Sequence, residues 1–144
     1  MALLAAPGSP LALRGEPLQP ADLAGMVLIL TEPGCTYRES LLRELAESGI
    51  TPASMLDSSS VQVMKQLAAG GFGVTYLPKV AAMDEMLDGR LVELPFANHS
   101  ADLAKQVVRV VRHKDKWVSP AMRAFIDLAE KSIVLQEGQP ADCL

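Results

Sequence analysis

Short runs dominated by apolar residues alternate along the chain with segments in which apolar residues recur at helical spacing. Apolar runs bounded by glycine or proline are typical of buried strands, and we expect strands at residues 1–6, 26–30, 53–56, 74–77, 91–94 and 106–111. The amphipathic segments predict helices at residues 37–48, 60–69, 78–89 and 119–135. A Pro-rich loop is expected over residues 7–20, before one helical turn at 21–25.

This alternation of strands and helices predicts an α/β fold with a mainly parallel sheet. Leu41, Leu42 and Leu45 share one face of their helix, which is either core or a surface for a partner. On the other helices, the residues expected to face inward are Val61, Met64, Leu67, Ala68, Phe125 and Ile126. The apolar pattern alone therefore predicts the strands, the helices and their candidate core faces.

Composition narrows the class of protein. The chain has 144 residues, of which 49% are hydrophobic, and this is typical of one globular domain. Its 13 basic and 17 acidic residues give a net charge of −4, which argues against direct DNA binding by this chain. Two cysteines cannot form a disulfide framework, and no apolar stretch approaches the roughly 20 residues of a membrane span. We therefore expect a cytoplasmic protein with no membrane segment.

Polar side chains gather at two predicted junctions between a strand and a helix. The first junction holds Cys35, Thr36 and Tyr37, and the second holds Ser58, Ser59 and Ser60. Thr36 with Glu39, and Ser59 with Gln62, have the spacing of a capping box. Ligands of open parallel sheets bind at the carboxyl ends of strands, and helix N-termini favour anions. The six residues are therefore either a binding site for a small anionic or polar ligand, or helix caps alone.

Enzymatic chemistry has little support in the sequence. A nucleophilic Cys35 would need a base, and the two candidates, His99 and His113, lie in no recognisable motif. No Cys/His pair has the spacing of metal ligands, and no glycine-rich phosphate loop follows a strand. We expect no catalytic residue, no metal and no cofactor, and an enzyme that uses Cys35 is the last of three hypotheses.

An ordered set of segments resembles the effector-binding domain of LysR-type transcriptional regulators. The matching segments are residues 34–38, 57–65, 69–78, 89–95 and 113–121, preceded by residues 3–6, 9–12 and 21–25. The resemblance extends from about residue 2 to residue 133. It implies a fold like that of the type 2 periplasmic binding proteins, in which two crossing strands join two α/β subdomains and a small inducer binds between them.

Carried onto this chain, the resemblance implies four regions. Residues 1–20 would be the first crossing strand and its loop, and residues 21–94 the second subdomain. Residues 95–135 would be the second crossover and the C-terminal part of the first subdomain, and residues 136–144 a tail. The family's helix-turn-helix and the early part of its first subdomain are not matched. The inducer contacts would fall on Cys35, Thr36, Tyr37, Ser58, Ser59 and Ser60, as the junctions suggest independently.

Two functional hypotheses follow, besides the enzyme. The chain is either the effector-binding module of a LysR-family regulator, without its own DNA-binding domain, or a structural remnant that associates but binds no small ligand. The first requires a small anionic or polar metabolite. Both predict a dimer, formed by self-association or with a full-length homologous subunit, since Val107, Val108, Val110 and Val111 would otherwise be uncovered. The family's dimers imply that the helix at 37–48 contacts the partner.

Overall fold

The computed structural model describes residues 1–96 and 111–137, with side chains described up to residue 131. The chain divides into two compact units, Met1–Gln106 and Val107–Leu144, and each is described by itself. The strand predicted at 106–111 lies outside the described residues except for Val111, which is in no strand. The four regions that the resemblance implies remain a prediction.

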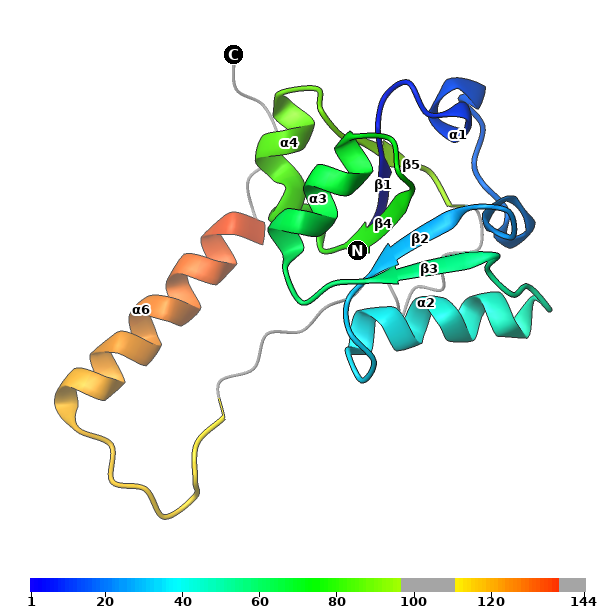
Figure 1. The fold of residues 1–144 in the computed structure, drawn as a ribbon. Coiled ribbons are helices and arrows are strands. Elements are labelled where there is room, and N and C mark those ends of the chain that lie inside the picture. The colour runs from blue at the N-terminus through cyan, green and yellow to red at the C-terminus, as the bar shows by residue number, and fades with distance from the viewer. Residues whose placement is uncertain (97–110, 138–144) are drawn as a thin grey trace. The chain divides into compact units, whose positions relative to one another are not determined.

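The first unit contains a sheet of five strands, β1 (Ala2–Ala5), β2 (Val27–Leu30), β3 (Ser54–Asp57), β4 (Val74–Leu77) and β5 (Val92–Leu94). Their order is β3-β2-β4-β1-β5 (Figure 1). Strand β2 is parallel to β3 and β4, whereas β1 is antiparallel to β4 and β5. The prediction of a mainly parallel sheet therefore holds only for the half around β2, because apolar runs indicate burial and not strand direction.

Helices surround the sheet in the positions that the spacing predicts, with one addition. They are α1 (Pro10–Arg14), α2 (Thr36–Glu47), α3 (Val61–Ala69) and α4 (Met83–Leu87), with 3-10 turns η1 (Pro20–Leu23) and η2 (Lys79–Ala82). Helix α1 corrects the prediction of a loop over residues 7–20. The Ser9 hydroxyl accepts a hydrogen bond from the Ala12 N–H, Pro10 begins the helix, and Gly15 ends it in a left-handed conformation.

Two apolar clusters cover the two faces of the sheet. Leu28 and Leu30 of β2 belong to the cluster that includes α2, whereas Ile29 between them belongs to the cluster that includes α3. This is the alternation expected along a strand that is buried on both faces. Leu41 is fully buried against the first face, so it is a core residue and the alternative of a partner surface is wrong for it.

Not every predicted core position is buried. Val61 at the start of α3 is 38% exposed, because the inward positions of this helix are taken by Met64 and Ala68. In the second unit, Phe125 of α6 (Pro120–Glu137) is 70% exposed. Helix α6 is the one element within the described part of that unit, so nothing described there covers its apolar side.

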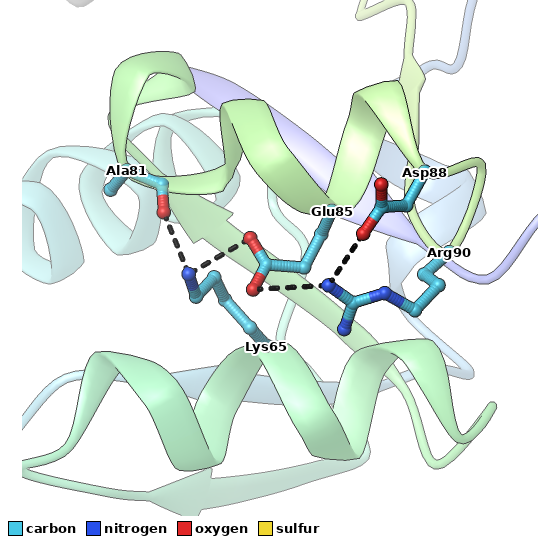
Figure 2. A network of polar contacts seen from close by, with 5 residues as sticks. All are labelled: Lys65, Ala81, Glu85, Asp88 and Arg90. Atoms are coloured by element: carbon cyan, nitrogen blue, oxygen red, sulfur yellow. Dashed lines mark hydrogen bonds and ion pairs between the residues drawn. The ribbon is translucent and has the colours of Figure 1, made fainter.

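A buried ion pair joins α3 to the segment that follows β4. Figure 2 shows Lys65 pointing toward Glu85, with Nζ 2.8 Å from Oε2 and 3.0 Å from the Ala81 carbonyl oxygen. Arg90 lies on the other side of the carboxylate and also contacts Asp88. The hydrogen bond from Lys65 lowers the pKa of Glu85 although burial opposes it. The pair thus fixes η2 and α4 against α3.

Candidate functional site

The two junctions selected from the sequence lie next to each other at the edge of the sheet where the carboxyl ends of β2 and β3 meet. Strands β2 and β3 are parallel neighbours, with Leu30 opposite Asp57 at their carboxyl ends. Beyond this pair, the Ser58 N–H donates to the Leu30 carbonyl at 3.0 Å. Because α2 and α3 both begin at this edge, the tertiary structure brings together the two turns that are more than 20 residues apart in the chain.

At the first junction, Gly34 turns the chain with a φ of +90° and Cys35 is the N-cap of α2. Thr36 is therefore the first helical residue, and the predicted capping box of Thr36 with Glu39 is wrong by one position. The Glu39 carboxylate instead accepts from the Gly34 N–H at 3.2 Å. Thr36 is exposed, whereas half-buried Tyr37 packs against the first core cluster.

The Cys35 thiol is half-buried at this helix start. Burial raises the pKa of the thiol, but hydrogen bonds from Thr31 and from the backbone N–H groups of Tyr37 and Arg38 outweigh it, so the net pKa is lowered. Cys35 is the N-cap residue of α2, but its side chain makes no capping hydrogen bond of standard geometry. Such a thiol can accept hydrogen bonds from a ligand.

At the second junction, Ser60 is the N-cap of α3 and its hydroxyl accepts from the Val63 N–H at 3.4 Å. The predicted capping box of Ser59 with Gln62 is therefore wrong by one position as well. The Ser58 hydroxyl accepts from the Ser60 N–H at 3.2 Å, which orders the turn. Ser59 is exposed beside these two half-buried serines. The turn presents hydroxyl groups at the same edge as Cys35.

Two further residues at this edge were not among the candidates from the sequence. Arg38 is only 7% exposed, and its Nη1 donates to the Thr31 carbonyl at 2.8 Å and to the carboxylate of Asp57. It therefore links the end of β2, the end of β3 and the first turn of α2. Its spacing from Leu41 and Leu45 places it on the buried face of α2, and this signal could have identified it.

The groups at this edge suit binding through hydrogen bonds and charge. They comprise the hydroxyls of the second junction, the thiol of Cys35 and the ion pair of Arg38 with Asp57. His99 lies outside the described residues and His113 belongs to the second unit, so neither histidine is part of the site as described in the first unit. Within residues 1–96 and 111–137, no three His, Cys, Asp or Glu side chains gather as metal ligands.

A pocket of about 230 Å³ lies elsewhere in the first unit, between α1 and β5. The pocket is lined by apolar residues and by two glutamates. The apolar residues include Leu11, Ala12, Val92 and Leu94, and the glutamates are Glu16 and Glu93. Strand β5 is at the opposite edge of the sheet from β3, so this pocket is separate from the two junctions. It is also smaller than most sites for small ligands, which are on the order of 300–1,000 Å³. We therefore take the edge at β2 and β3 as the candidate site.

Comparisons with known proteins agree with this architecture. An HTH-type transcriptional regulator of Bacillus subtilis, YwqM, which is itself uncharacterised, is 37% identical over 116 residues, covering 81% of this chain and 38% of the relative. The regulatory domain of MetR from N. meningitidis has a TM-score of 0.59 at 26% identity and covers 67% of this chain and 46% of that one. The CcmR regulatory domain of Synechocystis, in complex with 2-PG, has a TM-score of 0.66 at 17% identity, covering 91% and 61%.

These relatives are transcriptional regulators, and the solved structures are LysR regulatory domains with the fold of the type 2 periplasmic binding proteins. The chain spans less than two fifths of the length of YwqM. No helix in the described segments is long and apolar enough to cross a membrane. The model of the LysR substrate binding domain matches residues 1–133. The chain therefore belongs to the LysR substrate-binding domain family.

Proposed function

We propose that this chain is the effector-binding part of a LysR-type regulator and holds a small polar or anionic effector at the edge formed by β2 and β3. The observation that carries the proposal is the joining of both junctions through Arg38, which contacts Thr31 and Asp57 at once. Cys35, Thr36, Ser58, Ser59 and Ser60 belong to the two turns that this link joins and would supply hydroxyl, thiol and N–H groups, and Tyr37 is expected to approach the effector with its half-buried ring.

The likeness to the CcmR regulatory domain in complex with 2-PG supports a small ligand for this fold. Binding would act as a signal and not as the first step of a reaction. DNA binding by this chain is no part of the proposal, because its net charge is −4. A cytoplasmic location fits a regulator of transcription and is proposed with it.

We also propose that the chain associates with a second copy or with a full-length homologous subunit. Helix α6 presents exposed apolar side chains, and Trp117 before it is 75% exposed. An association-only protein is the second candidate function, because this apolar surface would serve it without any effector. The two candidates differ in whether any small molecule stabilises the first unit.

The test is thermal unfolding of the chain with a panel of carboxylates, amino acids and phosphates. An effector at about 100 times its dissociation constant should add about 2.7 kcal/mol to the free energy of unfolding. Ser60→Ala removes the cap of α3 at the site, and Ser9→Ala removes the equivalent cap of α1 away from it. Each should cost about 1 kcal/mol of stability, and only Ser60→Ala should weaken effector binding.

Three outcomes separate the hypotheses. Stabilisation by one compound, weakened by Ser60→Ala alone, supports the effector-binding function. A transition that no compound shifts supports the association-only protein. Turnover of any compound that is abolished by Cys35→Ser would support the enzyme and contradict both.

A further inference from the structure

We propose that Arg38 selects the effector by charge: a carboxylate or phosphate group of the effector binds its guanidinium in place of Asp57. The inference rests on the proposed function, since it concerns the same edge of the sheet. It adds to that function one specificity-determining residue and the charge of the ligand group that this residue recognises.

The guanidinium of Arg38 has unused donors. Its two recorded hydrogen bonds both leave from Nη1, one to the Thr31 carbonyl and one to the Asp57 carboxylate. Among the described residues, none is recorded from Nη2 or Nε. Arginine presents its donors as a planar fork that binds carboxylate or phosphate through two parallel hydrogen bonds. Nη2 and Nε are therefore the donors that a ligand group would take.

Asp57 is the member of the pair that can be replaced. It ends the edge strand β3, in which all four residues are exposed, and its side chain is 44% exposed against 8% for that of Arg38. An exposed carboxylate is well solvated by water and gains little from an ion pair. A buried guanidinium, in contrast, needs a counter-charge at all times. An incoming anion could supply this counter-charge while Asp57 turns to solvent.

The negative charges near Arg38 let the proposal predict whether the affinity for a ligand rises or falls when one of them is removed. While Asp57 stays, it repels a bound anion and attracts a bound cation. Exposed Glu32 and Glu39 act in the same sense, although the Glu39 carboxylate is held by the Gly34 N–H. Neutralising Asp57 should therefore strengthen the binding of an anion and weaken the binding of a cation such as an ammonium group.

The experiment is a titration of the whole chain with inorganic phosphate at constant ionic strength in chloride. Asp57→Asn should raise the phosphate affinity about fivefold, the change that corresponds to removing about 1 kcal/mol of repulsion. The matched control is Glu93→Gln, which removes the same charge from the exposed pair of Lys79 and Glu93 at the opposite edge. It should leave the affinity unchanged. Adding Arg38→Gln to Asp57→Asn should abolish the gain.

A second readout uses the wild-type chain, in which the counter-ion is present. The NMR signal of the Arg38 Nε–H should shift during the phosphate titration with the same dissociation constant. An affinity that Asp57→Asn leaves unchanged or weakens would overturn the proposal, and so would a gain that survives Arg38→Gln. An effector from the panel that is uncharged or cationic, and whose binding is insensitive to Arg38→Gln, would also overturn this proposal. The proposed function would then still stand. Phosphate binding that is lost with Arg38→Gln, while no effector is found in the panel, would overturn the proposed function instead.

Discussion

Glu44 on α2 is a buried carboxyl group, 8% exposed, and neither of its oxygens has a hydrogen-bond partner among the described residues. Burial raises the pKa of Glu44, and the neighbouring charge of Glu47 raises it further. Burial and the charge of Glu44 also raise the pKa of Tyr76, to about 12. A charged Glu44 is therefore unfavourable in the folded chain.

Glu44→Gln should stabilise the chain at pH 7 by on the order of 1 kcal/mol, because an unpaired buried charge is removed. Since the pKa of Glu44 is raised on folding, its favourable contribution is present below the unfolded value of about 4.3 and is lost as the pH rises through the folded value. The advantage of Glu44→Gln should thus grow with pH above about 4.

Urea unfolding at several pH values measures this difference. Glu47→Gln, at an exposed position of the same helix, is the control and should give a smaller gain. A Glu44→Gln variant no more stable than the wild type across this pH range would show that the charged Glu44 carboxylate does not destabilise the folded chain.

At the scale of the elements, Gly73, which directly precedes β4, leaves no room for a side chain beside the first residue of β2. A Cβ atom there would lie 2.3 Å from the Val27 carbonyl oxygen, a distance that the pairing of these strands cannot accommodate. Gly73→Ala should therefore destabilise the chain by about 1–3 kcal/mol, the usual effect of overpacking. Gly25→Ala, where a Cβ would meet nothing within 4 Å, should be nearly neutral in the same thermal unfolding measurement. Equal stability of the two variants would contradict the close approach.

The ion pair of Lys65 and Glu85 holds one element of the site, since Lys65 lies on α3 and Ser60 is the N-cap of that helix. Glu85→Gln should lower the melting temperature at pH 7, because it leaves the Lys65 ammonium buried without its counter-charge. Glu93→Gln, in the exposed pair with Lys79, should lower it less.

The pH dependence of this pair is opposite to that of Glu44. Since the pKa of Glu85 is lowered in the folded chain, its contribution is present above the unfolded value of about 4.3 and is lost as the pH falls through the folded value. The difference between wild type and Glu85→Gln should therefore shrink in acid. Melting curves at pH 7 and below pH 4 check this, and a difference that stays constant would argue against the ion pair.

At the scale of the whole molecule, the described chain is one complete sheet unit and a second unit with a single described helix. The proposed association predicts that sedimentation will depend on concentration and that Phe125→Glu will reduce the dependence, because Phe125 is 70% exposed on α6. Leu13→Glu introduces the same charge at an apolar residue of α1 that is 74% exposed, and it should have no effect. A concentration-independent wild type would contradict the proposed association.

The two junctions of the candidate site can be predicted from the sequence, but the ion pair that links them cannot. The junctions of Cys35 and Ser60 follow from local turn and cap chemistry, although the pattern predicts each helix start one position away from where it lies. The ion pair of Arg38 with Asp57 joins residues 19 positions apart. No local pattern places such residues together, because their contact depends on the parallel pairing of β2 with β3.

Local apolar spacing and ordered motifs are sufficient to predict the order of most elements, the two junctions and the family. The apolar pattern does not predict helix α1, because the helix is short and begins with a proline inside a Pro-rich segment. Strand direction, the burial of Leu41 but not of Val61, and the neighbours of each charge depend on the tertiary structure. Burial and ion pairing are properties of packed surfaces, and packing brings together residues that are distant in the chain.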